Sequence, residues 1–165
     1  MSLDLKFFAQ LRGTLTNASD LTTAGAPVDL AQQLNFVDGA GAGAANRIFL
    51  DTRTVTASGT DSLDLAGALT DPFGAALTFA RIKGLFVVAR ATNVTDIRIT
   101  RPASNAVPLF SAAGYIPVKP GGFFGWFDPS AAGVAVTAAT ADLLDMVNSG
   151  ATDAIYNIAI IGAAS

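Results

Sequence analysis

Alternation between apolar and polar side chains recurs along most of this chain, and this period of two residues predicts β-strands. Residues 47–57 place Phe49 and Val55 on the same side of an extended chain. Residues 94–101 alternate strictly and predict a half-exposed strand. Residues 80–92 are apolar on both sides near their centre, which makes them the clearest prediction of a core strand.

Other segments carry weaker forms of the same pattern. Residues 5–16 predict a partly alternating strand, and residues 28–37 predict either a strand or a short amphipathic segment. Residues 140–150 fit a helix capped by Thr140 and also a strand that ends in an Asn-Ser-Gly turn, and we favour the strand. The remaining predictions are a polar, turn-rich segment at 17–27, a glycine loop at 38–46, an edge strand or ordered loop at 106–118, and short strands at 133–138 and 154–162.

The residue types also favour β-structure. The chain has no glutamate and only three lysines, whereas threonine, valine, isoleucine and phenylalanine are plentiful. Eight or more short strands separated by turns predict an all-β fold, a two-sheet antiparallel β-sandwich of jelly-roll type. Residues 26–165 are assigned to this single domain, and residues 1–25 to an N-terminal strand or arm whose composition would allow it to order on a partner.

Composition excludes several kinds of function. The chain has no histidine and no cysteine, so it supplies no imidazole or thiol for catalysis or zinc binding, and we expect no enzyme activity, cofactor or metal. Its net charge is −3 and its basic residues are scattered, which argues against a nucleic-acid partner. No apolar run suits a membrane helix, and the first residues do not resemble a secretory signal. Only 14% of the residues are charged, which suits a surface that neighbouring molecules cover.

Three groups of residues suggest a binding or catalytic site, and each has a simpler explanation. The glycines of residues 38–46 invite phosphate binding, but a strand pattern follows them instead of the helix that a phosphate loop requires. Asp61 and Asp64 lie close in sequence without the ligand spacing of a calcium loop, so we expect them to cap turns. Asp142 and Asp145 are the nearest local acid pair, but on a strand they face opposite sides.

Residues 119–129, KPGGFFGWFDP, concentrate three phenylalanines and the only tryptophan. On a strand, Phe124 and Trp126 share one face and Phe123 and Phe127 share the other. One pair is expected in the core, while the other meets a neighbouring subunit, a loop of the same chain or a sugar ring; we favour the subunit. The predicted interface, with a subunit or a capsid, comprises Tyr115, Phe123, Phe124, Trp126 and Phe127.

Several short blocks resemble small virion proteins of tailed bacteriophages. Residues 45–89 resemble a recurrent block of that family, and the Leu-Asp-Leu-Ala-Gly motif at 63–67 is the most specific part. The later matches are Pro-Gly-Gly at 120–122, Val-Thr-Ala at 136–138, Asp-Leu-Leu at 142–144, Asn-Ser-Gly at 148–150 and the terminal 160–162. Together these blocks span roughly half of the chain, and the first forty residues carry no resemblance.

The resemblance implies a non-enzymatic structural protein of the virion. It implies a capsid decoration or cement protein of jelly-roll type, a homotrimer that binds the major capsid protein on the outside of the head. The alternative is a tail or head-fibre module that binds a receptor or a host-surface glycan through its outward aromatic residues.

Overall fold

The computed structural model describes residues 2–111 and 114–165. Strands make up 57% of the chain, and the described residues contain no helix, so the prediction of an all-β fold is confirmed. In chain order the strands are β1 (Leu5–Ala18), β2 (Thr23–Asp38), β3 (Ala44–Ala45), β4 (Arg47–Val55), β5 (Thr60–Asp64), β6 (Leu69–Thr70), β7 (Ala76–Leu77), β8 (Arg81–Ala89), β9 (Ile97–Thr100), β10 (Tyr115–Val118), β11 (Phe123–Phe127), β12 (Val134–Ala135), β13 (Leu143–Asn148) and β14 (Ala154–Ala163).

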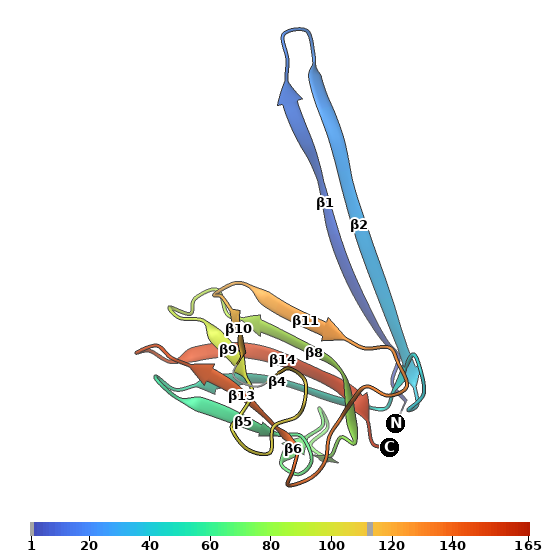
Figure 1. Cartoon of the computed structure of the whole chain (residues 1–165), viewed down its shortest axis with the longest axis vertical. Helices are drawn as coiled ribbons and strands as arrows, with labels where there is room; N and C mark the ends of the chain where they lie inside the picture. The colour runs from blue at the N-terminus through green and yellow to red at the C-terminus, as the bar shows by residue number, and fades with distance from the viewer. Residues whose placement is uncertain (1, 112–113) are drawn as a thin grey trace.

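The first two strands form a long antiparallel hairpin that projects from a body made of the other strands (Figure 1). We call β1, β2 and the turn between them the arm. Its turn is closed by Ser19, whose amide and hydroxyl both donate to the carbonyl of Thr22, at 3.0 and 2.7 Å. The turn is confined to the residues between Ala18 and Thr23. The rest of the segment 17–27, which was predicted to be turn-rich, is extended, because each residue from Thr23 to Pro27 pairs with β1.

The body contains two larger antiparallel sheets. One has the strand order β11-β8-β14-β4, with β12 also paired to β8, and the other has the order β10-β9-β13-β5. A small β6-β7 ladder lies beside them, and β3 pairs in parallel with the end of β2. The central position of β8, between β11 and β14, explains why its sequence is apolar on both sides, whereas the edge strand β4 alternates.

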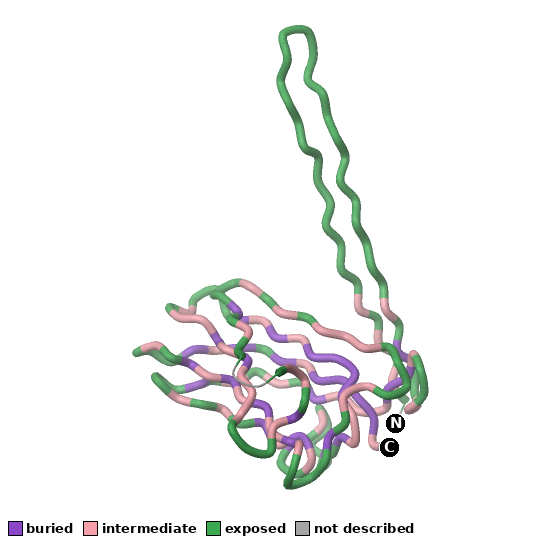
Figure 2. Tube along the Cα trace, in the orientation of Figure 1, coloured by how far each residue is buried: buried purple, intermediate pink, exposed green. Residues whose placement is uncertain are grey.

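Apart from a small cluster around Phe36, Ala45 and Ile161, both sheets contribute to one large hydrophobic cluster. Val87 and Ile158 enter it from one sheet, and Ile99 and Leu144 enter it from the other. Figure 2 shows that the buried residues lie in the body, while the arm is exposed along nearly all of its length. The arm therefore receives stability from the core only at its base.

Most predicted strands are present. β4, β8, β13 and β14 match the predicted segments, and the choice of strand over helix for residues 140–150 is confirmed. β9 is shorter than predicted, and β10 is an edge strand as the prolines indicated, apart from residues 112–113 of that segment, which lie outside the described residues. The strand predicted at 133–138 shrinks to β12, because Gly133 has a φ of 57° and Thr137 exchanges backbone hydrogen bonds with Ala141 in a tight turn.

The division of the chain also differs from the prediction. The boundary predicted between residues 25 and 26 falls inside β2, because residues 5–18 pair with 23–36 in an unbroken ladder. The segment that stands apart from the body is therefore the whole hairpin and not its first strand alone.

Candidate interaction surface

The aromatic strand β11 has the two faces that its sequence predicts. Phe124 and Trp126 pack against the core cluster, while Phe123 and Phe127 point the opposite way. Phe127 lies over Gly84 of the neighbouring strand, where an added Cβ would come within 2.7 Å of its ring. Phe123 is 70% exposed. One aromatic pair of β11 therefore packs against the core, and the other lies on the outer face of the sheet.

The base of the arm covers part of this outer face. The ring of Phe7 lies 4.1 Å from that of Phe127 and 6.0 Å from that of Phe86, between centroids. Phe86 lies 5.8 Å from Phe123, which forms the exposed end of this aromatic row. The chain's own arm therefore covers Phe127, whereas Phe123 stays available to another molecule.

The five residues predicted to form one interface lie in three places. Phe124 and Trp126 contribute to the core, and Phe123 and Phe127 lie on the outer face of their sheet. Tyr115 belongs to β10 in the other sheet, where the Arg98 guanidinium lies 4.8 Å from the centre of its ring. A surface that joins the arm to the body can include Phe123 and Phe127, but not the other three.

The arm has one apolar and one polar face, which follow from its register. Cross-strand partners in an antiparallel ladder point to the same side, and the pairs Leu5–Phe36, Phe7–Leu34 and Leu11–Leu30 fall on one side. We call this side the apolar face; its residues are Leu5, Phe7, Ala9, Leu11, Gly13, Leu15, Asn17, Ala24, Ala26, Val28, Leu30, Gln32, Leu34 and Phe36. The polar face carries the pairs Lys6–Asn35 and Arg12–Asp29.

A groove of about 530 Å³ lies where the apolar face meets the body. Phe7, Leu11 and Leu30 line it from the arm, and Phe86 and Phe123 line it from the body. Its lining, taken over the described residues, includes no charged side chain. The apolar face and the aromatic row of β8 and β11 thus form one largely apolar surface that bends at the arm's base, where Gln10 and Gln32 also line the groove.

Lys83 fixes the base of the arm to the body. It is fully buried at a β-bulge between β8 and β14, and its Nζ donates to the carbonyls of Ala40, Gly41 and Ala44 at 2.9, 2.5 and 2.9 Å. These carbonyls belong to the segment that directly follows β2. An ammonium with three acceptors is fully satisfied, so it tethers this segment and with it the direction in which the arm leaves the body.

This role explains the glycine loop. The loop turns its carbonyl oxygens toward a cation, while the amide of Gly43 donates to Pro129 and that of Gly39 donates to Ala45. A phosphate cradle requires the opposite polarity, with free amides, so the simpler reading as a loop between strands is confirmed. Burial and the neighbouring Arg81 lower the pKa of Lys83, while Asp128 opposes them.

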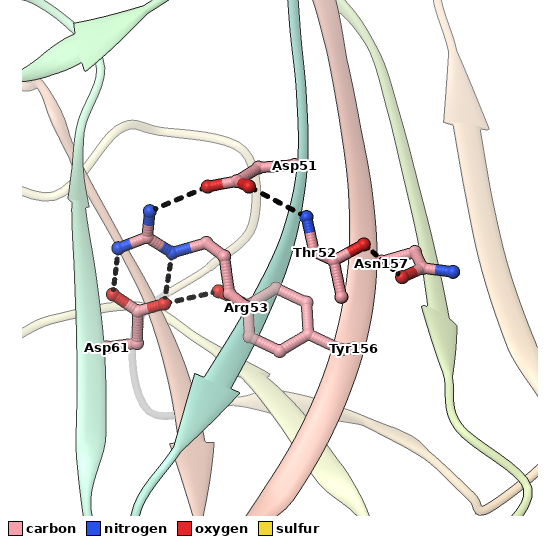
Figure 3. A network of polar contacts seen from close by, with 6 residues as sticks. All are labelled: Asp51, Thr52, Arg53, Asp61, Tyr156 and Asn157. Carbon is pink, nitrogen blue, oxygen red and sulfur yellow. Dashed lines mark hydrogen bonds and ion pairs between the residues drawn. The ribbon is translucent and has the colours of Figure 1, made fainter.

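A second polar network joins the two sheets at their β4–β5 edge (Figure 3). Arg53 donates two parallel hydrogen bonds to Asp61, at 2.5 and 2.8 Å, and a third to Asp51 at 3.1 Å. Tyr156 donates its phenol to Asp61 at 2.7 Å. Thr52 bonds the side chain of Asn157 at 2.9 Å, which links β4 to β14 within one sheet. Asp61 therefore forms an ion pair and does not cap a turn as its position in the sequence suggested.

The protonation of this network is set by its own contacts. The hydrogen bond to Asp61 is the main cause that raises the pKa of Arg53. Burial acts to raise the pKa of Asp61, but the hydrogen bonds from Arg53 and Tyr156 outweigh it and hold that pKa below its ordinary value. Burial, and then the bond to Asp61, raise the pKa of Tyr156. Asp61 is thus held charged and Tyr156 neutral, the states in which the network is satisfied.

The other acids singled out from the sequence occupy turns and strands. Asp64 caps a turn by accepting from the amide of Ala66 at 3.0 Å, as expected. Asp142 accepts from the amide of Ala139 at 2.5 Å, and Asp145 lies within β13 opposite Ser62. Within residues 2–111 and 114–165, no three acidic, histidine or cysteine side chains gather as metal ligands would, and no helix there is long and apolar enough to span a membrane.

Comparisons with known proteins add no assignment. The chain matches no protein-family model, no curated protein and no solved structure. The functional proposal below therefore rests on the residues of this chain and on their geometry.

Two features of this surface escaped the sequence analysis. The period of two is only partial within β1 alone, and it becomes clear once the odd positions from Leu5 to Leu15 are set beside the even positions from Val28 to Phe36. The contacts of Lys83 could not be predicted, because a single lysine within an apolar strand does not reveal which carbonyls surround it.

Proposed function

We propose that this protein is a non-enzymatic structural protein of a tailed-bacteriophage virion, a capsid decoration protein that holds neighbouring subunits together. The observation that carries the proposal is the arm, a projecting hairpin whose apolar face is uncovered beyond its base. Large exposed apolar surfaces mark sites of protein association. A small body that presents such an arm is suited to bridging subunits.

Other features support this proposal. The Arg53, Asp61 and Tyr156 side chains of the body pair with one another, as structural ion pairs do. The low fraction of charged residues suits a surface that neighbours cover. The motifs at 63–67 and 120–122 resemble those of small virion proteins of tailed phages. We assign the major capsid protein and further copies of this chain as its partners.

The proposal includes the finer architecture of the body. Its two larger sheets bury alternate residues in one shared cluster, which supports a two-layer β-sandwich, and we assign it to the jelly-roll type. A homotrimer, which the resemblance implies, is the assembly proposed for the body, and it leaves each arm to contact a further copy.

The location of the protein tests the proposal. Antibodies raised against the folded chain are applied, with gold labels, to purified phage particles produced by the virus or lysogen that carries the gene. Labels spaced over the head surface, together with recovery of the protein from purified particles by mass spectrometry, are the expected result. Absence of the protein from purified particles would contradict the proposal, and labels confined to the tail would favour the receptor-binding alternative.

A further inference from the structure

The apolar face of the arm lacks cover within the described chain once it leaves the body. Leu11, Leu15 and Leu30 are 64%, 73% and 68% exposed. A two-stranded hairpin by itself is marginally stable in water, because each strand has only one neighbour and both faces are exposed to solvent. An arm of this length thus gains most of its stability from whatever covers that face.

The distribution of charge on the arm defines what can cover it. In the paired part of the arm the charged residues Lys6, Arg12 and Asp29 all lie on the polar face. A charged partner surface placed on the apolar face would lose its hydration without gaining an opposite charge. The occupant must therefore be flat, elongated and uncharged, and the apolar face of a second arm has all three properties.

The area of the face approaches that of a specific interface only when the groove is included. The part that the body leaves exposed runs from Ala9 to Asn17 in β1; it spans about 30 Å, and a two-stranded ribbon is about 10 Å wide, so one face offers about 300 Å². Two such faces together bury about 600 Å², against the roughly 1,000 Å² that a specific interface needs. The groove beside Phe86 and Phe123 adds apolar area at the end of the arm that is nearest the body.

We infer that the arm packs through its apolar face against the same face of the arm of a second copy of this chain. The inference rests on the role of the arm in the proposed function and goes further by naming the partner of this face. Apolar side chains of the two ribbons interdigitate, as they do between packed sheets about 10 Å apart. The polar faces, with Arg12 and Asp29, remain in water.

Cross-linking of single thiols tests which face meets the second copy. The chain has no cysteine, so each variant carries a single thiol. Leu11 lies near the middle of β1, so its equivalent lies close by whether the two arms run parallel or antiparallel. Faces about 10 Å apart are too distant for a direct disulfide, so a short bifunctional maleimide joins the thiols. With this reagent Leu11→Cys should convert mostly into cross-linked dimers, while Arg12→Cys, on the opposite face at the same height, should remain mostly uncross-linked. Failure of Leu11→Cys to cross-link, or equal cross-linking of both variants, would overturn the inference.

A second pair of variants keeps strand pairing intact while it changes one face. Leu11→Lys with Leu30→Glu places an opposite-charge pair on the apolar face, and Arg12→Glu with Asp29→Lys keeps such a pair on the polar face with the two charges exchanged. In sedimentation velocity the first should weaken association by about 100-fold or more, because its charges would be buried. The second should associate like the wild-type chain; equal behaviour of the two variants would overturn the inference.

These measurements separate the inference from the proposed function. They use the purified chain with no capsid protein, so a monomer in solution would overturn the arm-to-arm contact and leave the location of the protein on virions untouched. Conversely, absence of the protein from virions would not alter the result of the cross-linking.

Discussion

Lys83 donates three hydrogen bonds to the segment that follows the arm, and the exposed Lys119 offers a matched comparison. We expect Lys83→Met to lower the free energy of unfolding by about 2–4 kcal/mol, because the carbonyls of Ala40, Gly41 and Ala44 lose a charged donor. Lys119→Met should change it by less than about 0.5 kcal/mol. Chemical denaturation measures both, and an equal effect of the two substitutions would contradict the tethering role of Lys83.

Asp61 makes stability depend on pH in a definite direction. Its pKa is lowered in the folded protein, so its contribution is present above the unfolded pKa of about 4 and is lost as the pH falls through the folded value. At pH 7, Asp61→Asn should cost about 1.5–3 kcal/mol. The difference between wild type and Asp61→Asn should shrink on acidification below about pH 4, as followed by denaturation at several pH values; a constant difference would contradict the ion pair with Arg53.

Phe123 and Trp126 lie on opposite faces of the same strand and should respond differently to substitution. Trp126 packs on the core, so Trp126→Ala should destabilise the fold by about 3 kcal/mol. Phe123 is exposed at the groove, so Phe123→Ala should leave the melting temperature almost unchanged and weaken self-association instead. Thermal melts and sedimentation separate the two effects, and a reversed pattern would contradict the assignment of the faces.

At the scale of elements, strands were predictable where burial follows the side-chain period. β4 and β8 could be placed from sequence because alternation, or its loss at the centre of a sheet, reports directly on which sides are covered. The prediction of a turn-rich segment at 17–27 was wrong for most of its length. Cross-strand pairing holds residues such as Gly25 and Pro27 in β2 despite their weak strand propensity.

The candidate surface was predictable only in part, for a related reason. Sequence alternation separated Phe123 from Phe124, since that split depends on one strand alone. It did not show that Phe7 of the arm would cover Phe127, or that Tyr115 would lie in the other sheet, because both depend on how distant elements pack.

Close approach of two backbone segments explains why one position in the body requires glycine. A Cβ on Gly162, at the bulge between β8 and β14, would lie 2.1 Å from the carbonyl oxygen of Arg81, whereas a Cβ on Gly13 in the arm would meet nothing within 4 Å. We expect Gly162→Ala to destabilise the protein by about 1–3 kcal/mol, since the backbone must shift. Gly13→Ala should have little effect on stability. Thermal unfolding compares the two, and equal stability of both variants would contradict the tight bulge.

At the scale of the whole molecule, a compact body carries an arm whose apolar face remains uncovered (Figure 2). The Lys83 tether and the aromatic contacts of Phe7 hold this arm to the body, so its apolar face and the groove are presented together. Such a shape suits a subunit of an assembly more than an isolated monomer, because the exposed face gains stability only through contact with a neighbour.

The central claim is that this chain assembles through its arm, and its mass in solution tests that claim most directly. Light scattering after gel filtration is measured over a dilution series with the unmodified chain. The account predicts a stable multiple of the 16.8 kDa chain mass, which falls toward the monomer only on strong dilution. A mass of one chain at every concentration would contradict it.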